Sequence, residues 1–466
     1  MTVAPVLPIE NSILKKEGKS LSVLTMTPDP KIMKAVEQLG YRVTVGDVST
    51  QAGLNINLAQ QGLLTLASDA GGHLQVAESG EIAYLFPKNF RSILRNKFLR
   101  LQLQEWWDKI WGILFYLIRI SFGIILLLSI VLIFVAIAII LMSLRAGSDD
   151  DSGGGGSNSG GGGIFFFPRF WGPDIFWFFD PYDYGRSSSP RQAKSSQTSR
   201  TRELNFLEAV FSFLFGDGNP NADLEERRWQ EIATVIRNSG GAVAAEQIAP
   251  YLDDVGEGYQ RESEDYMLPV LTRFDGRPEV SPSGEIVYHF PELQTTAKLA
   301  QPKSVQGYLR ERLWRFSQAS SGQLMLSIGL GAVNFVGALV LGSLLSSGEI
   351  AAQIGGLVAF VNLIYPLLLI YGVGFLAIPL IRYFWIQWKN SQIEQRNQKR
   401  QSQAVALNQA GDSLQKKISY AQQFAAQNVI TEEDLVYTSE TDLLDQDLKA
   451  RERIDAEWRR RLESGS

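Results

Sequence analysis

The chain has 466 residues, of which 45% are hydrophobic and 20% charged, and its formal net charge is −5. The absence of cysteine excludes disulfides, thiolate metal sites, cysteine-ligated iron–sulfur clusters and cysteine nucleophiles. Only His73 and His289 provide imidazole nitrogens. The net charge is too small to indicate a partner, so the distribution of charge along the chain has to supply that information.

The first soluble stretch has the pattern of a helix-turn-helix followed by a wing. Ala52-Gly53 marks a tight turn between two short amphipathic helices, and the second of these, Asn57–Ala67, would be the recognition helix. Two strands of alternating pattern follow at His73–Val76 and Glu81–Phe86, joined by a turn that contains glycine. This order of elements predicts a winged-helix-like module.

Three apolar stretches are long enough to cross a bilayer, which takes about 20 residues of helix. Ile120–Leu144 has no charge, and Leu324–Leu345 and Leu357–Ile381 are joined by a short connection typical of a helical hairpin. Asn334 and Asn362 are amides at membrane depth. We expect them to form hydrogen bonds between helices rather than to line a substrate path, because polar side chains in membrane helices pair in this way.

Basic residues beside all three spans place each flank on the cytoplasmic or stromal side. Three crossings do not satisfy this arrangement, because the first span has no returning partner. The aromatic stretch Ile164–Phe179 contains two prolines and two charges, which make it a poor spanning helix. We therefore expect an interfacial or re-entrant segment there, and the topology between residues 110 and 185 stays open.

A motif of eight residues occurs twice. GEIAYLFP at Gly80–Pro87 recurs as GEIVYHFP at Gly284–Pro291, with six of eight positions identical. Upstream, five positions align at a fixed offset, namely Ile32, Val36, Gly40, Val43 and Val48 with Ile232, Ile236, Gly240, Val243 and Ile248. We infer an internal repeat with a four-residue insertion in the second copy, and hence a second winged-helix-like module.

The distribution of charge distinguishes two possible functions of such modules, DNA binding and protein recognition. A DNA-binding winged helix needs cations to contact phosphates, yet no Lys or Arg occurs between Arg42 and Lys88. In the second copy, Asn221–Glu292 holds six arginines against fifteen acidic residues, a balance of −9. We therefore expect no nucleic-acid binding and favour recognition of other proteins. A membrane-tethered winged-helix transcription regulator is the alternative.

One stretch partly matches a calcium-binding loop. Oxygen-bearing side chains alternate there, as calcium ligands do, at Asp217, Asn219, Asn221 and Asp223. The match then fails, because the sixth position is alanine instead of glycine and the twelfth is arginine instead of glutamate. We favour a turn that leads into a capped helix. Whether residues 217–223 bind calcium stays open.

No motif in the sequence indicates catalysis. His73 and His289 lie on predicted wing strands without neighbouring ligands, so structural or surface roles are favoured. The chain contains neither a G-x-S-x-G elbow nor a phosphate-binding loop. The apolar spans lack paired carboxylates and inverted helical repeats, which argues against a transporter. We expect no catalytic, cofactor-binding or metal-binding residues, no cofactor, and a protein that is not an enzyme.

Longer motifs resemble a family of multi-pass membrane proteins of cyanobacteria and chloroplasts. They are NFLEAVFSFLFGDGNPNADLEERRW, FPKNFRSILRNK, the Gly-rich loop before FFFPRFWGPDIFWFFDP, and VYTSETDLLDQDL. The resemblance covers nearly the whole chain and implies a thylakoid role around the assembly of photosystem I. Members are loosely labelled as iron–sulfur cluster biosynthesis proteins, but a chain without cysteine could serve that process only indirectly. The family supplies no catalytic residues.

The sequence predicts α+β soluble modules, two winged-helix-like repeats, combined with α-helical transmembrane segments. In chain order we expect a flexible N-terminus (1–19), module 1 (20–100), an interfacial helix and first transmembrane helix (101–145), a Gly/Ser linker (146–163), an aromatic interfacial or re-entrant segment (164–184), a basic linker (185–203), module 2 (204–300), an amphipathic approach helix (301–322), a transmembrane hairpin (323–388) and a charged helical C-terminal tail (389–466).

The function that these features favour is a membrane-anchored scaffold or assembly factor. Its partners would be the membrane and protein subunits of a membrane complex, and the oligomeric state stays open. We expect a multi-pass protein of the thylakoid or plasma membrane, with its soluble modules mainly on the cytoplasmic or stromal side.

Overall fold

The computed structural model describes residues 29–97, 99–146, 204–253, 255–256, 262–299, 301–346, 349–409 and 411–464. The chain divides into two units: unit 1 comprises residues 1–106, 222–311 and 396–466, and unit 2 comprises residues 107–221 and 312–395. Within the described residues the fold is mostly helical, with small, mainly antiparallel sheets. The flexible N-terminus, the Gly/Ser linker after Ala146, the aromatic segment (164–184) and the basic linker (185–203) that the sequence predicts lie outside the described residues.

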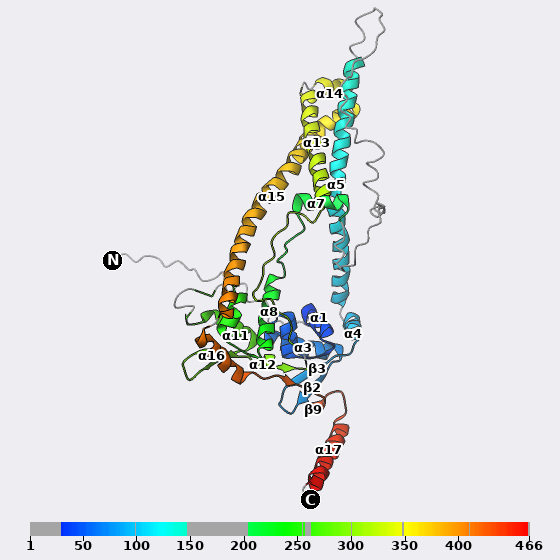
Figure 1. The fold of residues 1–466 in the computed structure, drawn as a ribbon. Coiled ribbons are helices and arrows are strands. Elements are labelled where there is room, and N and C mark those ends of the chain that lie inside the picture. The colour runs from blue at the N-terminus through cyan, green and yellow to red at the C-terminus, as the bar shows by residue number, and fades with distance from the viewer. Residues whose placement is uncertain are drawn as a thin grey trace, which may run out of the picture. The chain divides into compact units, whose positions relative to one another are not determined.

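Most of unit 2 comes from three long helices, α5 (Leu99–Ala146), α13 (Ser321–Leu345) and α15 (Gly356–Asn408). Each has a stretch long and apolar enough to cross a membrane. These stretches lie side by side (Figure 1) and share a core that includes Ile133 of α5, Leu341 of α13 and Val361 of α15. A short helix, α14 (Glu349–Ile354), lies between α13 and α15 in the sequence.

One of the two asparagines in the apolar helices makes the expected hydrogen bond between helices. The hydroxyl of Ser129 on α5 donates to Oδ1 of Asn334 on α13 at 2.6 Å, and both side chains are buried. The prediction is therefore confirmed for Asn334. Asn362, by contrast, is exposed on α15 and has no such partner among the described residues.

Glycines allow α13 and α15 to approach closely. A Cβ added at Gly331 would lie 2.4 Å from the ring of Phe375, and one at Gly342 would lie 2.0 Å from Oη of Tyr365. Both distances are far below van der Waals contact, so no larger residue fits without a shift. These small residues of α13 thus serve helix packing.

A short aromatic helix, α7 (Phe206–Phe215), completes the core of unit 2. Its residues Phe206, Val210 and Phe213 pack with Leu126 and Ile130 of α5. The backbone amide of Asn205 donates to Glu208 at 3.0 Å and fixes the start of the helix, as in a capping box.

Unit 1 contains two series of elements in similar order. The first series is α1 (Pro30–Gln38), β1 (Arg42–Thr44), α2 (Val45–Ala52), α3 (Ile56–Ala70), β2 (His73–Ala77), β3 (Ile82–Leu85) and α4 (Phe90–Lys97). The second series is α8 (Leu224–Asn238), β4 (Ala242–Val243), α9 (Ala245–Ile248), η1 (Ala249–Tyr251), η2 (Asp265–Met267), α11 (Leu268–Phe274), β5 (Arg277–Val280), β6 (Ile286–His289) and α12 (Pro291–Gln294).

The repeated motif forms equivalent strands in the two series. The sheet orders are β1-β3-β2 and β4-β6-β5, all antiparallel, and the register pairs Val43 with Tyr84 and Val243 with Tyr288. In each hairpin turn a glycine adopts a left-handed conformation, with φ 83° at Gly80 and φ 86° at Gly284. Glycine recurs at this point because other residues adopt such φ values only with strain.

The two series share one hydrophobic core. It includes Val36, Leu63 and Tyr84 from the first series and Ile232 and Phe274 from the second. Close approach between the series depends on glycine, since a Cβ added at Gly46 of α2 would lie 2.1 Å from the carbonyl oxygen of Glu292. The two copies therefore fold as parts of one unit.

The C-terminal residues add strands to unit 1 as well as helices. They form α16 (Asp412–Ala421), η3 (Gln422–Phe424), β8 (Asn428–Val429), β9 (Leu435–Thr438) and α17 (Leu443–Ser464). β9 pairs antiparallel with β2, and β8 pairs in parallel with β7 (Thr295–Thr296). The sequence predicted a charged helical tail from 389 to 466, and the strands depart from it because β2 and β7 offer free backbone edges to this stretch.

Residues 301–320 form an extended segment and not the amphipathic helix that the sequence predicted for 301–322. Asparagine amides take the place of helical hydrogen bonds. In unit 2, Asn390 accepts from the amide of Trp314 at 2.8 Å and donates to its carbonyl at 2.9 Å. In unit 1, Asn397 binds both backbone groups of Glu311 in the same way. The backbone polar groups of Glu311 and Trp314 are thereby satisfied without a helix.

Candidate functional site: a polar pocket beside α15

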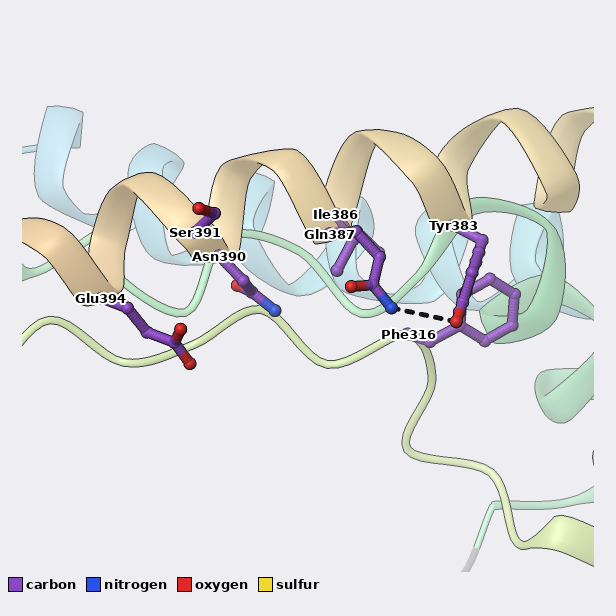
Figure 2. A pocket seen from close by; sticks show the side chains of 7 residues that line it. All are labelled: Phe316, Tyr383, Ile386, Gln387, Asn390, Ser391 and Glu394. Carbon is purple, nitrogen blue, oxygen red and sulfur yellow. Dashed lines mark hydrogen bonds between the residues drawn. The ribbon is translucent and has the colours of Figure 1, made fainter.

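A pocket of about 340 Å³ lies in unit 2, where α15 emerges from its apolar stretch. Its lining residues are Phe316, Tyr383, Ile386, Gln387, Asn390, Ser391 and Glu394. Figure 2 shows Tyr383, Gln387, Asn390 and Glu394 directed from α15 toward the segment that carries Phe316. Their spacing of four, three and four residues places these four side chains on one face of the helix.

The polar groups of the pocket differ in how far they are already satisfied. Both polar atoms of the Asn390 amide bond the backbone of Trp314, so this side chain holds the wall in place. Nε2 of Gln387 donates to Oη of Tyr383 at 2.9 Å. This bond leaves the Tyr383 proton, the Gln387 carbonyl and the Glu394 carboxylate able to bond a ligand.

Aromatic and cationic side chains surround the pocket without lining it. The Arg382 guanidinium lies 4.3 Å from the centroid of the Phe316 ring and also donates to the carbonyl of Phe316 at 2.6 Å. Trp314 and Trp385 meet edge to face with centroids 5.2 Å apart. The contacts of Arg382 hold the ring of Phe316 in place as an apolar part of the pocket wall.

The residues of the possible calcium loop are placed among protein donors. Asp217 accepts from Arg119 at 3.0 Å, from Ser212 at 2.6 Å and from the amide of Gln318 at 2.8 Å. Asn221 bonds both backbone groups of Arg312. In unit 1, Asp223 pairs with Arg227 at 3.2 Å. Over the described ranges, no three His, Asp or Glu side chains gather as a metal site.

The two histidines lie where the sequence placed them, on hairpin strands. His73 is on β2 with Nδ1 3.3 Å from the carbonyl of Ser439, and His289 is on β6 with Nε2 3.1 Å from Gln294. Each therefore contacts ordinary hydrogen-bonding groups of unit 1.

A buried ion-pair cluster in unit 1 is structural in character. Glu311, 5% exposed, accepts from Arg396 at 2.6 Å and from Arg400 at 3.0 Å. Burial acts to raise the pKa of Glu311, but the hydrogen bonds and charges of the two arginines outweigh it and lower the pKa below its ordinary value. The carboxylate is therefore held ionised, which suits an anchor rather than a proton donor.

Sequence reasoning missed the pocket, although a local signal was present. The polar side chains recur at 383, 387, 390 and 394 immediately after the third apolar stretch, which is the spacing of one helical face. Phe316 completes the pocket from a segment expected to be helical, and nothing near it in the sequence indicates that contact. The pocket becomes visible only once residues 312–316 are known to be extended.

Comparison with known proteins gives one clear relationship. No family model matches the chain, and no solved structure gives a significant match. An uncharacterized chloroplastic protein of Arabidopsis thaliana is 39% identical over 444 residues, which cover 93% of this chain and 82% of that relative. Similarity at this level and over this length shows common descent of both units, and the chain belongs to the family of this chloroplastic Arabidopsis protein.

Proposed function

We propose that the protein is a membrane-anchored scaffold or assembly factor that acts through protein–protein interaction in the biogenesis of a thylakoid complex, photosystem I. In this proposal the three apolar helices make it a multi-pass protein, with unit 1 on the stromal or cytoplasmic side, which requires the chain to return to that side between Ala146 and Ala222. Support for the compartment comes from the chloroplastic relative and the family resemblance. The mode of action rests on features of unit 1.

The soluble scaffold in this proposal is a pair of winged-helix-like modules. In the first copy, α2 and α3 are joined through Gly53, which adopts φ 62°, and the hairpin β2–β3 follows. The second copy has the same sheet order but shorter helical elements. Winged-helix-like modules bind either nucleic acids or proteins, so the kind of partner has to be inferred from the side chains on the module surface.

The observation that carries the proposal is the uncharged outward face of α3. The exposed residues Asn57, Gln60 and Gln61 are neutral, and Leu58 and Leu64 are exposed apolar side chains on the same helix. A helix that enters a DNA groove depends on cations nearby, whereas exposed leucines among amides suit a protein partner. We assign partner recognition to this face.

The structure also uses the remainder of the first module for internal contacts. The carbonyl of Gly53, in the turn between α2 and α3, accepts from Arg273 at 2.6 Å, and that guanidinium lies 4.3 Å from the centroid of the Trp229 ring. The wing strand β2 pairs with β9. These contacts occupy the turn and one wing edge, whereas the exposed leucines of α3 stay available to a partner.

A double substitution of the α3 face tests this function. We expect Leu58→Asp with Leu64→Asp to abolish recovery of photosystem I subunits in a pull-down from membranes in mild detergent. Stability should change by less than about 0.5 kcal/mol, because both side chains are at the surface. Leu299→Asp, at another exposed leucine of unit 1, is the matched control and should retain the partners. Equal recovery with all three proteins would refute the assignment.

The alternative function, a membrane-tethered transcription regulator, makes a different prediction. The full chain in detergent would shift duplex DNA tightly at low salt, and the binding would weaken steeply as salt rises. The neutral face of α3 and the acidic second copy lead us to expect no such shift. Tight, salt-sensitive binding would reverse the preference.

A further inference from the structure

We infer that the pocket beside α15 binds the uncharged glycosyl headgroup of a membrane lipid. The pocket begins at Tyr383, two residues after the apolar stretch of α15 ends at Ile381. Trp385 and Trp388 are exposed on the same turns. Aromatic side chains of this kind settle at the level of lipid headgroups.

The length of the pocket suits a headgroup that projects from the interface. Tyr383 and Glu394 are eleven positions apart, which corresponds to about 16 Å of helix at 1.5 Å per residue. A volume of about 340 Å³ lies in the usual range for small-molecule sites and has room for one hexose or two. Leu380 and Ile381, both exposed, precede the pocket and offer an apolar surface to the acyl chains.

The free hydrogen-bonding groups of the pocket match hydroxyl groups. A sugar hydroxyl both donates and accepts, so it needs partners of both kinds. The Gln387 carbonyl and the Glu394 carboxylate accept, while the Tyr383 hydroxyl, which already accepts from Gln387, has its proton to donate. Phe316 and Ile386 supply an apolar surface for the C–H face of a sugar ring.

The residues that line the pocket disfavour ionic headgroups of either sign. They include one carboxylate, Glu394, and no cation, so a phosphate or sulfonate inside the pocket would meet a negative charge and no cationic partner among them. A choline or other ammonium group would seek the ring of Phe316, but the Arg382 guanidinium already lies 4.3 Å from that ring centroid. An uncharged polyhydroxylated group meets neither obstacle.

Binding is measured with the full chain in a polyoxyethylene detergent, since sugar-based detergents would compete. Digalactosyl diacylglycerol, phosphatidylcholine and phosphatidylglycerol of matched acyl chains are titrated, and retained lipid is counted by native mass spectrometry. We expect preference for the galactolipid. Gln387→Leu should weaken its binding about five- to tenfold, the loss expected for one hydrogen bond of roughly 1 to 1.4 kcal/mol.

The control is Gln395→Leu, which removes an exposed glutamine from α15 outside the pocket and should leave galactolipid binding unchanged. Glu394→Gln keeps an acceptor while removing the charge, so it should retain most galactolipid binding. It should also relax the discrimination against phosphatidylglycerol. Equal binding by the protein with and without Gln387→Leu would overturn the inference. Preference for phosphatidylcholine that is lost in Glu394→Gln would also overturn it, by indicating a cation site.

Discussion

The two copies of the repeat share a hairpin framework but differ in what their helical parts do. In the first copy α3 is fifteen residues long and turns a neutral face outward, whereas the corresponding α11 of the second copy is seven residues long. Both copies receive parts of the C-terminal residues, β9 on β2 in the first copy and α16 on β6 in the second. The comparison indicates that the two copies share their strands and turns. Their helices differ, because the helix of the first copy faces outward and that of the second copy serves packing.

Two aligned positions make this difference concrete. The side chains of Asp47 and Gln247 both accept from the amide three residues earlier, at 3.0 Å from Thr44 and 2.9 Å from Ala244. Asp47 is buried and also accepts from Arg237 at 2.8 Å. Its further donors are the hydroxyl of Thr296 and the amide of Ala297, both at 2.9 Å. One carboxylate thus caps a helix of the first copy and binds residues of the second copy and of the stretch after it.

The largest expected effect on stability concerns Asp47, which has more hydrogen-bond partners than Gln247. Asp47→Ala should lower the stability of unit 1 by about 4 kcal/mol, because it removes a cap and leaves the charge of Arg237 without its buried partner. Gln247→Ala should cost about 1 kcal/mol, the value of a cap alone. Thermal unfolding of the full chain in detergent compares the two variants. Equal losses would mean that Asp47 serves only as a cap.

The packing of the C-terminal helix α16 on the second copy should depend on the side chain of Lys417. This side chain is 7% exposed and bonds Glu246 at 3.0 Å and also Glu264. Lys417→Ala should cost about 3 kcal/mol, since it leaves two carboxylates without their cation. It should also speed hydrogen exchange in α16. Lys416→Ala, at the exposed neighbouring position, is the control and should change neither quantity by a measurable amount.

Alkaline pH should weaken the same contact. Burial acts to lower the pKa of Lys417, but its hydrogen bonds and charge interactions with Glu264 and Glu246 outweigh this, so its pKa is raised. Burial and the hydrogen bond to Glu264 raise the pKa of Tyr288. A group whose pKa is higher in the folded than in the unfolded state contributes its full stabilisation when the pH is below the unfolded pKa, which is about 10 for both groups. This stabilisation is lost as the pH rises through the folded pKa.

The measurement is the difference in melting temperature between the wild-type chain and Lys417→Ala across the alkaline range. This difference should be constant below about pH 10 and shrink above it. A difference that persists unchanged at high pH would show that the ammonium charge is not what secures α16.

The smallest effect concerns two glycines of the first copy with similar φ. A Cβ at Gly53 would lie 3.0 Å from the carbonyl oxygen of Glu226, whereas one at Gly80 would meet nothing within 4 Å. Gly80→Ala should therefore cost about 1 kcal/mol from backbone strain alone. Gly53→Ala should cost about 2 kcal/mol, because crowding against α8 is added. Melting temperatures of the two variants would test the order, and a reversed order would contradict this packing of the copies.

Local patterns in the sequence were sufficient for the elements whose contacts are local or repeated. The motif at Gly80–Pro87 and Gly284–Pro291 predicted two hairpins because a turn glycine and alternating strands define a hairpin within a few residues. The long apolar stretches predicted α13 and the apolar first half of α15 for the same reason. Asn334 was recognisable as a partner for another helix because an amide at that depth needs one.

Elements defined by distant partners escaped the sequence reasoning. Leu435–Thr438 is a strand because β2 offers it an edge, and β2 lies near the other end of the chain. Residues 312–316 are extended because Asn221 and Asn390 bond their backbone, and neither asparagine is near them in sequence. The pocket could not be predicted for the same reason, because Phe316 reaches it only when residues 312–316 are extended.

The pairing of β9 with β2 has a consequence for biosynthesis. A ribosome makes β2 before the three apolar helices and β9 after them. The sheet of the first copy therefore gains strand β9 only after these helices have been made and residues 428–438 have reached the same compartment as residues 42–85. Completion of this sheet thus requires β2 and β9 to lie on the same side of any membrane that the intervening helices enter, and three crossings alone would leave them on opposite sides.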